Sequence, residues 1–369
     1  MAETIIVGIS GGVDSSVTAF LLKKQGYNVE CIFMKNWEGD DDSQCAAEED
    51  YKDALSVCDH LDLPLHSVNF SKEYWDGVFQ YFIDEYAKGR TPNPDVICNR
   101  EIKFKAFLDY ALELGAKKIA TGHYARIEKS NGQFKLLKGL DQSKDQSYFL
   151  YLLGQDALSK SSFPIGEIDK TNVRTIAKDS GLANYSKKDS TGVCFIGEQK
   201  FFKDFLKKYI PAEPGMIETI NGQVCGQHDG LMYYTMGQRK GLGIGGGHGK
   251  MEAPWFVADK DLSRNSLIVA QGHDHPALFH QELIANQVHW ISGSSPDKLS
   301  GLSAKIRYRQ ADQNCQLTHI TQDRCTVKFD HPQFAITPGQ SIVFYKGDEC
   351  LGGAIIAVSY THLTLPTKA

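Results

Sequence analysis

The sequence lacks the features that mark membrane and secreted proteins. No run of residues approaches the 18 consecutive apolar positions that a membrane-spanning helix needs. The amino terminus, MAETIIVGISGG, has no basic stretch followed by a long apolar run, so it does not resemble a signal peptide. We therefore expect a cytoplasmic protein with no membrane partner.

Metal-binding cysteine patterns are also missing. The nine cysteines include no CxxC pair, which argues against a zinc site or a thioredoxin-like motif. Their number is odd, their spacing is scattered, and thiols stay reduced in a cytosol. We expect most of them to be buried thiols, and we predict no metal-ligating side chains.

The charge balance excludes one class of function. A formal net charge of −5 is not that of an indiscriminate nucleic-acid binder. A local basic face stays compatible with it, because steering of a ligand depends on where the charges lie. A length of 369 residues, with 41% hydrophobic residues, suits two or three globular domains.

Strand and helix patterns alternate in the first part of the chain. Runs of β-branched and apolar residues predict strands at 4–9, 29–34, 65–70 and 118–121. Apolar residues at helical spacing predict helices over 15–25, 51–58, 75–86 and 104–114. Repeated β-α-β units imply an α/β fold, a doubly wound parallel sheet with ligands at the carboxyl ends of its strands.

Residues 91–100, TPNPDVICNR, hold two prolines and two asparagines, and we predict a loop without regular structure there.

The pattern changes near residue 200. A helix is expected over 201–209, followed by a hairpin at Asn221-Gly222 and by many short strands from residue 266 onward. We therefore predict three parts: a nucleotide-binding catalytic domain over 1–198, a small mixed α/β domain over 199–278 and a β-barrel over 279–358. Residues 359–369 show no pattern and stay unplaced.

The strongest motif is VGISGGVDSS at residues 7–16. An expected strand ends there and a helix begins, and Gly11 and Gly12 let the backbone turn tightly with several N–H groups pointing inward. The helix amino terminus adds partial positive charge, so the loop suits a phosphate group. Asp14 would repel phosphate unless a cation such as Mg²⁺ bridges them or the carboxylate caps the helix. The motif is neither a Walker A loop nor GxGxxG.

SGGVDSS resembles the pyrophosphate-loop (PP-loop) motif of the ATP pyrophosphatases, which bind ATP, adenylate a carbonyl or carboxylate oxygen and release pyrophosphate. Further segments resemble the tRNA-specific 2-thiouridylases along nearly the whole chain, up to about residue 357. They are FMKNW at 33–37, TPNPDVICNREIKF at 91–104, ATGHYAR at 120–126, KDQSYFL at 144–150, STGVCFIGE at 190–198 and YTMGQRKGLGIGG at 234–246.

This resemblance implies a sulfurtransferase that uses ATP, with Mg²⁺, to adenylate the C2 oxygen of the wobble uridine of a tRNA. Sulfur then replaces that oxygen and gives 2-thiouridine, with AMP and pyrophosphate released. By resemblance, Cys194 carries a persulfide and Cys98 attacks, which leaves a disulfide between them. The sulfur would come from a donor protein, either a cysteine desulfurase or a sulfur relay protein. Because a thiolate is the nucleophile, at least one of the two thiols should have a lowered pKa.

The resemblance also implies binding residues. Those expected to bind ATP are Gly8, Ile9, Ser10, Gly11, Gly12, Val13, Asp14, Ser15, Met34 and Gly122. Those expected to contact tRNA are Asn93, Pro94 and Asp95 at the target base and Lys144, Asp145, Gln146, Arg307 and Tyr308 elsewhere, with the small domain contributing. Asp95 is also a candidate general acid or base, or else a turn-capping residue. His123 is expected to shape the ATP pocket and not to ligate a metal.

Two other functions are compatible with the loop alone. An amidating synthetase would need an ammonia source, and no glutaminase-like region is seen. A non-enzymatic RNA-binding protein would have no use for an intact SGGVDSS.

The sulfur-transfer hypothesis makes a spatial demand, because Cys98 and Cys194 must meet beside the phosphate loop.

Overall fold

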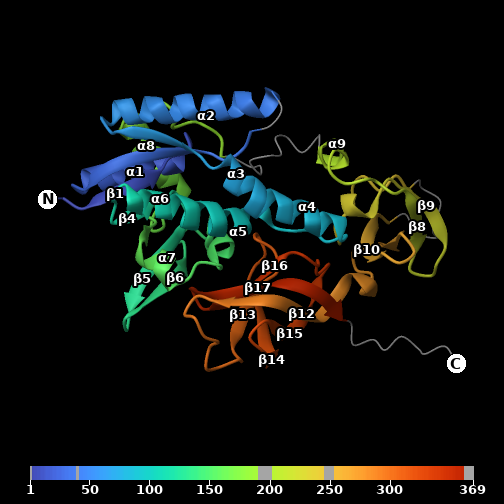
Figure 1. Cartoon of the computed structure of the whole chain (residues 1–369). Coiled ribbons are helices and arrows are strands. Elements are labelled where there is room, and N and C mark those ends of the chain that lie inside the picture. Colours follow the sequence, from blue (N-terminus) through green and yellow to red (C-terminus); the bar gives the residue numbers. More distant parts are fainter. Residues whose placement is uncertain (1, 39–40, 190–201, 245–252, 361–369) are drawn as a thin grey trace.

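The computed structural model describes residues 2–38, 41–189, 202–244 and 253–360. The amino-terminal domain, a small domain and a β-barrel are distinct in Figure 1. None of the helices in these ranges is both long enough and apolar enough to cross a membrane. Cys194 and residues 361–369 lie outside the described residues.

A five-stranded parallel sheet, in the order β3-β2-β1-β4-β7, forms the centre of the first domain. Its strands are β1 (Thr4–Gly8), β2 (Asn28–Lys35), β3 (Leu65–Asn69), β4 (Lys118–Ala120) and β7 (Ser161–Ser162). Side chains of β1 alternate between the faces: Ile5 and Val7 join one core, and Ile6 joins the other. The predicted doubly wound parallel sheet is confirmed.

Helices cover both faces of this sheet. One face carries α1 (Val13–Lys24), α2 (Asp41–His60) and α8 (Lys170–Asp179), which lie together at the top of Figure 1. The other face carries two longer helical stretches. The first is α3 (Ser71–Tyr74), the π-helix η1 (Trp75–Phe79) and α4 (Gln80–Ala87); the second is α5 (Pro94–Cys98), the π-helix η2 (Asn99–Ala106) and α6 (Phe107–Glu113). The short helices η3 (Ser147–Leu150) and α7 (Gln155–Ser159) follow later.

The prediction of an irregular loop over 91–100 is wrong. Only its beginning is irregular, and a helix starts at Pro94 and includes Cys98. Asn93 is extended and precedes the helix, and Pro94 occupies its first turn, where the missing N–H costs nothing and the fixed φ suits the helix. Asn93 and Pro94, which look like helix breakers in the sequence, therefore mark the start of a helix.

The small domain contains a four-stranded sheet in the order β10-β11-β8-β9. It comprises the helix α9 (Phe202–Lys207), β8 (Gly215–Thr219), β9 (Val224–His228), the 3₁₀ turns η5 (Leu231–Tyr233) and η6 (Pro276–Leu278), β10 (Trp255–Asp261) and β11 (Ser266–Gln271). The predicted hairpin is confirmed, since β8 and β9 pair antiparallel around Gly222, whose φ is +80°.

The carboxyl-terminal strands form a closed barrel, as predicted. Its strands are β12 (Phe279–Trp290), β13 (Leu302–Lys305), β14 (Gln313–Ile320), β15 (Arg324–Phe334), β16 (Ser341–Lys346) and β17 (Glu349–Tyr360). They pair in the order β12-β15-β14-β13-β16-β17, and pairing of β12 with β17 closes the ring. Strand β17 reaches two residues into the stretch that the sequence left unplaced.

The barrel packs closely against the first domain. The hairpin β5 (Ala125–Ser130) and β6 (Gln133–Lys138) of the first domain extends the barrel sheet through β17. Strand β16 alternates between two cores, with Ile342 and Phe344 inside the barrel and Val343 and Tyr345 against the first domain. This double burial explains why its sequence is apolar at consecutive positions.

Candidate active site

The glycine loop lies where the sequence places it, between the end of β1 and the start of α1. Gly11 has a φ of +72°, and a Cβ there would collide with the backbone carbonyl of Asp50. A Cβ at Gly122, just after β4, would lie 2.7 Å from the backbone nitrogen of Ser15. Both glycines are therefore required by close backbone approach at the carboxyl edge of the sheet.

Serine hydroxyls hold the loop in shape. The Ser10 backbone N–H donates to Oγ of Ser15 at 3.2 Å, and the Ser16 hydroxyl donates to the Gly12 carbonyl at 2.8 Å. The side chains of Ile9 and Val13 are buried in the core beneath. Among the predicted ATP residues, these two can therefore offer a ligand only their backbone groups.

Asp14 has a partner that the sequence reasoning missed. Its two carboxylate oxygens each accept a hydrogen bond from the Lys170 ammonium at 2.8 Å, and one also accepts from the Tyr124 hydroxyl at 2.7 Å. Asp14 lies inside the first turn of α1 and does not cap it. The ammonium of Lys170 on α8 therefore neutralises the Asp14 carboxylate. The sequence alone suggested a bridging Mg²⁺ or a helix-capping role instead.

Gly8 and Met34 lie side by side at the ends of β1 and β2. A Cβ at Gly8 would be 3.2 Å from the Met34 methyl and 3.1 Å from the Phe107 ring. Phe107 begins α6 on the helical stretch that also carries Cys98. Cys98 lies nine residues before Phe107 on that stretch, with the π-helix η2 between them, so one continuous helical stretch connects Cys98 to the end of β1.

Asp95 and Cys98 share α5. Cys98 is buried, whereas Asp95 is exposed although protein atoms crowd its carboxyl. This crowding removes water and raises the pKa of Asp95, and the nearby ammonium of Lys103 offsets part of the rise. A carboxyl with a raised pKa in such a place is suited to proton transfer.

His123 is buried beside the helical stretch that carries Asp95 and Cys98. Its Nδ1 shares a hydrogen bond of 2.7 Å with the Thr121 hydroxyl, and its ring contacts Phe104 and Phe163. Burial holds its pKa well below the ordinary value, and the charge of Lys103 adds to the effect. Within the described residues no group of three or more His, Cys, Asp or Glu side chains could hold a metal ion.

The structure brings two of the predicted tRNA segments together. The Tyr308 hydroxyl donates to the Lys144 carbonyl at 3.3 Å, and the Tyr308 ring lies 4.4 Å from that of Phe149. The Phe149 carbonyl in turn accepts from the amide of Asn99, the residue after Cys98, at 3.1 Å. The barrel loop, the segment 144–150 and the helix of Cys98 are therefore contiguous.

Not all of these side chains face outward. Asp145 is buried and accepts from the backbone N–H groups of Gly139 and Ser147, both at 3.1 Å. Gln146 accepts from the Tyr124 N–H at 2.9 Å. Arg307 is half-buried and donates to the Ala335 carbonyl at 2.9 Å. These three side chains hold the loops in shape, and the expected contacts of all five residues with tRNA stay predictions.

Asn93-Pro94-Asp95 is positioned from the barrel side. The Gln340 amide donates to the carbonyls of Thr91 and Pro92 at 2.9 and 3.1 Å, and the Thr91 N–H donates to the Pro338 carbonyl at 3.0 Å. The site is therefore built by two domains: the sheet supplies the phosphate loop, and the barrel fixes the segment before α5.

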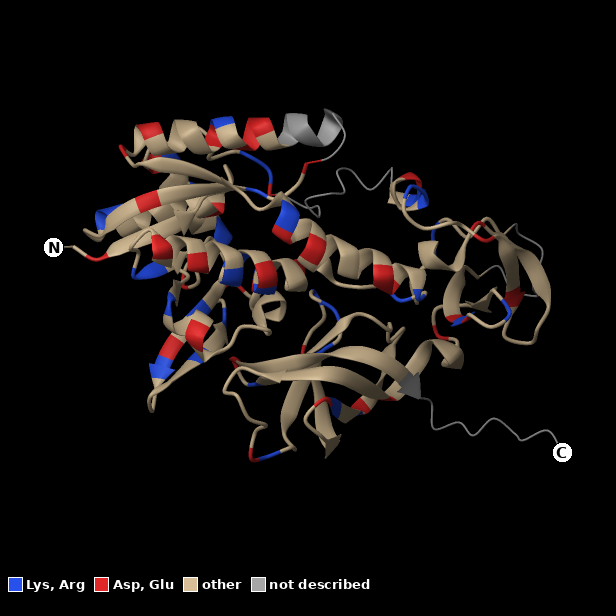
Figure 2. Cartoon of the chain, in the orientation of Figure 1, with Lys and Arg blue, Asp and Glu red and all other residues tan. Residues whose placement is uncertain are grey.

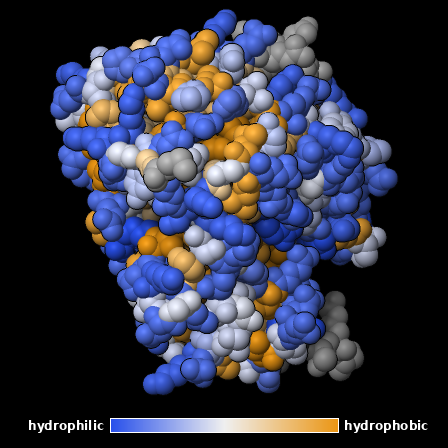
Figure 3. All heavy atoms as spheres, turned by 60° about the vertical axis from the view of Figure 1, so that its left-hand side comes forward, coloured by the Kyte–Doolittle hydropathy of each residue, from blue (hydrophilic) through white to orange (hydrophobic). Residues whose placement is uncertain are grey.

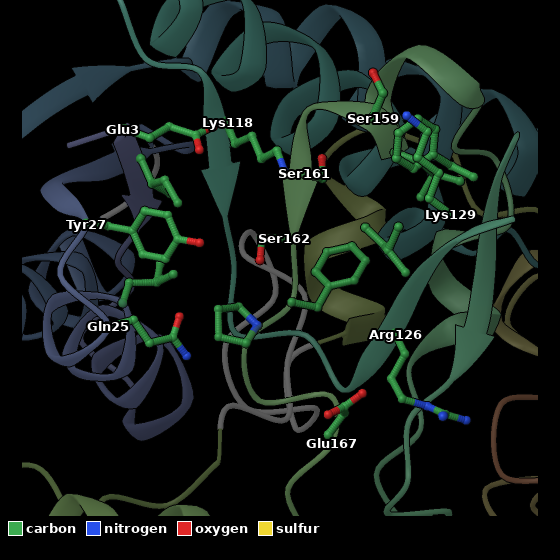
Figure 4. A pocket seen from close by; sticks show the side chains of 17 residues that line it. Glu3, Gln25, Tyr27, Lys118, Arg126, Lys129, Ser159, Ser161, Ser162 and Glu167 are labelled. Carbon is green, nitrogen blue, oxygen red and sulfur yellow. The ribbon is translucent and has the colours of Figure 1, made fainter. Parts of the chain in front are cut away.

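A hollow of about 370 Å³ lies elsewhere (Figure 4). Glu3, Lys118 and Ser161 line it, so it sits at the amino ends of β1, β4 and β7. Ligands of doubly wound sheets bind at the opposite edge, which argues against a nucleotide site there.

Charged and apolar residues are both distributed over the parts of the molecule that Figures 2 and 3 show. In Figure 2 residues of both signs are interspersed over the first domain. On the face shown in Figure 3, apolar residues form separate patches among hydrophilic ones.

Comparison with known proteins gives consistent matches. Family models match for a tRNA methyl transferase HUP domain over residues 3–198, a tRNA methyl transferase PRC-barrel domain over 203–271 and an aminomethyltransferase β-barrel domain over 280–356. The fold and the glycine loop define the class as proteins with a PP-loop, HUP-type nucleotide-binding domain joined to two β-rich domains.

Curated relatives then identify the family. The tRNA-specific 2-thiouridylase MnmA of Hydrogenovibrio crunogenus is 60% identical over 98% of this chain and 95% of its own length. That of Methylococcus capsulatus is 56% identical over 98% of each chain. The solved U34-tRNA thiolase NcsA from Methanococcus maripaludis aligns over 56% of this chain and 63% of its own, with 16% identity and a TM-score of 0.35. The chain belongs to the tRNA-specific 2-thiouridylase MnmA family.

Proposed function

We propose that this protein is a tRNA-uridine 2-sulfurtransferase that converts the wobble uridine of tRNA into 2-thiouridine at the expense of ATP. Identity of up to 60% to 2-thiouridylases over nearly the full length carries the proposal. The glycine loop supports it, because its shape is maintained by Gly11, Gly122 and the serine hydroxyls. Such a reaction takes place where tRNA and ATP are found, in the cytoplasm.

ATP is proposed to bind at the carboxyl edge of the sheet. The loop Ser10–Ser15 would hold its phosphates through backbone N–H groups, with Gly8, Met34 and Gly122 beside the rest of the nucleotide. Mg²⁺ would arrive with the triphosphate, since Mg²⁺ is commonly bound through phosphates and water with few protein ligands. Asp14 is already engaged by Lys170 and Tyr124.

Adenylation comes first, because the C2 oxygen of uracil is a poor leaving group. Ionised Asp95 would accept the N3 proton of the flipped-out base while the C2 oxygen attacks the α-phosphorus. The bond to pyrophosphate breaks, and pyrophosphate leaves. Asn93 and Pro94 would contact the base, and Lys144 and Tyr308 the surrounding RNA.

Sulfur transfer then uses Cys98 and Cys194. A donor protein, either a cysteine desulfurase or a sulfur relay protein, would leave a persulfide on Cys194. The Cys98 thiolate would attack the Cys194 sulfur atom and form a disulfide with it, while the outer sulfur bonds to C2 and AMP leaves. Whether that sulfur attacks as hydrosulfide or still bound to Cys194, the disulfide needs a two-electron thiol reductant before the next turnover.

One assay tests the function. Purified protein with ATP, Mg²⁺, a persulfide donor and unmodified tRNA should form 2-thiouridine, detected by mass spectrometry of the nuclease digest. Product should require each component. Pyrophosphate release driven by a small carboxylate or amide in place of tRNA would point instead to a synthetase.

The pH dependence should report on Asp95. Activity that needs the ionised carboxylate rises with pH through its pKa, which crowding already raises. The Lys103 ammonium favours the ionised form, so Lys103→Met should raise this pKa further and move the acid limb of the kcat profile to higher pH. Lys105→Met, which removes an exposed ion pair with Glu101, is the matched control and should leave the limb in place. A limb that Lys103→Met leaves unmoved would contradict the role given to Asp95.

A further inference from the structure

The helical stretch from α5 to α6 has one face that runs between the two halves of the candidate site. Side chains four residues apart lie on the same side of a helix, and those on this face are Asp95, Asn99, Lys103 and Phe107. Phe107 lies against Gly8 at the end of β1, whereas α5 lies nearer the barrel (Figure 1). The face therefore leads from the segment expected to hold the target base to the edge of the sheet expected to hold ATP.

The π-helix η2 carries three cationic side chains, and they are not equally neutralised. Glu101 forms ion pairs with Arg100 at 2.7 Å and with Lys105 at 2.9 Å. Lys103 is half-buried, and among the residues that the structure describes no carboxylate lies within ion-pair distance of its ammonium. Partial removal of water from a cation without a counter-charge is unfavourable, so this position favours an anion.

The Lys103 ammonium acts on two groups of the candidate site. Burial raises the pKa of Asp95 and lowers that of His123; the charge of Lys103 opposes the first shift and adds to the second. The ring of the next residue, Phe104, lies 5.7 Å from that of His123. The cation is thus close both to the carboxyl expected to act on the base and to the residue that follows Gly122.

Asn99 lies between Asp95 and Lys103 on this face and is also incompletely paired. It is 3% exposed, and its amide nitrogen donates to the Phe149 carbonyl at 3.1 Å. Its amide oxygen accepts no hydrogen bond within the described part of the chain. A buried acceptor beside an unpaired cation suits a ligand with both hydroxyl donors and anionic oxygens, as a nucleotide has.

We propose that Lys103 is a catalytic residue that binds a non-bridging oxygen of the α-phosphate of ATP while the uridine is adenylated. The proposal rests on the proposed function, because the α-phosphorus must lie between nucleotide and base when the C2 oxygen attacks it. In that step an oxygen–phosphorus bond forms, and the bond to pyrophosphate breaks with its electron pair leaving on pyrophosphate. Negative charge is spread over the non-bridging oxygens, and the ammonium neutralises it without giving up its proton.

Single-turnover rates of tRNA-dependent pyrophosphate release test this contact. They are measured with the full-length protein on the plateau above the acid limb, where Asp95 is ionised in every variant. Lys103→Met should lower the rate about 30-fold, because a hydrogen bond between charged groups is lost. The dissociation constant of ATP, measured by titration calorimetry without tRNA, should change by less than about fivefold, since the phosphate loop persists. Lys103→Arg keeps the charge and should recover most of the rate, and Lys105→Met is the matched control.

Sulfur substitution in ATP gives a readout that a structural role would not move. ATP with sulfur in place of one non-bridging α-phosphate oxygen exists as two diastereomers. Sulfur accepts hydrogen bonds weakly, so the diastereomer with sulfur at the contacted oxygen should carry a rate penalty of about fivefold in the wild type. Lys103→Met has no contact left to weaken, so the ratio of the two rates should shift by about that factor in favour of this diastereomer. Lys105→Met should leave the ratio unchanged.

Two results would overturn the proposal. One is an unchanged rate of pyrophosphate release in Lys103→Met. The other is a lower rate with the diastereomer ratio of the wild type, which would mean that the ammonium does not contact the α-phosphate. Failure of the proposed function is a different outcome, since wild-type protein would then release no pyrophosphate in response to tRNA.

Discussion

Replacing Cys98 by serine is expected to abolish multiple-turnover formation of 2-thiouridine while tRNA-dependent pyrophosphate release continues. A serine hydroxyl is not ionised at neutral pH and cannot form the disulfide that releases sulfur from Cys194. The loss should reach three orders of magnitude or more, roughly the size seen when a nucleophile is removed. The measurement is the ratio of 2-thiouridine to pyrophosphate formed per enzyme.

The substitution is nearly isosteric, so folding should survive the change at this buried position. Cys194→Ser should give the same uncoupling, whereas Cys45→Ser, at a cysteine without a proposed role, should leave both products unchanged. If Cys98→Ser still formed 2-thiouridine through many turnovers, sulfur release would not involve Cys98. If the Cys98→Ser variant lost pyrophosphate release as well, the contribution of Cys98 would be to the structure of the site.

Much of the fold follows from local patterns in the sequence. The apolar run of β1 passes directly into glycines and then into a helix with apolar residues at helical spacing, so the phosphate loop and the parallel sheet were predictable together. Strand-length runs separated by turn residues likewise indicated the barrel. The helix at Pro94 was missed because prolines and asparagines were read as breakers, although the same residues suit a helix start.

The electrostatic part of the site was not predictable in this way. Asp14 and its partner Lys170 are far apart in sequence, and nothing in the local pattern around Lys170 signals the contact. The guanidinium of Arg307, a residue expected to contact tRNA, donates to the carbonyls of Met236 and Ala335, which only the folded small domain and barrel bring near. Local periodicity thus predicts the helices, the strands and the glycine loop. The ion pairs depend on which of these elements pack together in the folded protein. The convergence of Cys98 with Cys194, a residue outside the described ranges, stays a prediction.

The Lys170–Asp14 pair gives the second large effect. Lys170→Met removes the ammonium that neutralises Asp14 and leaves a partly buried carboxylate beside the loop, which still accepts from the Tyr124 hydroxyl. Like charges about 4 to 8 Å apart near a protein surface repel by about 2 to 4 kcal/mol, so the uncompensated Asp14 charge should oppose the triphosphate by a factor of roughly 100. We expect kcat/KM for ATP, measured by tRNA-dependent pyrophosphate release, to fall by that factor. Lys178→Met on the same helix, at an exposed position, is the control.

A second substitution separates neutralisation from direct phosphate binding. If Lys170 acts by neutralising Asp14, then Asp14→Asn in the Lys170→Met background removes the repulsion and should recover about tenfold or more, a coupling energy above about 1.4 kcal/mol. If Lys170 acts by touching the phosphates itself, the double variant should be no better than Lys170→Met alone. Recovery is the expected outcome, because both Asp14 oxygens are bonded to the Lys170 ammonium and like charge at this edge of the sheet would oppose the triphosphate.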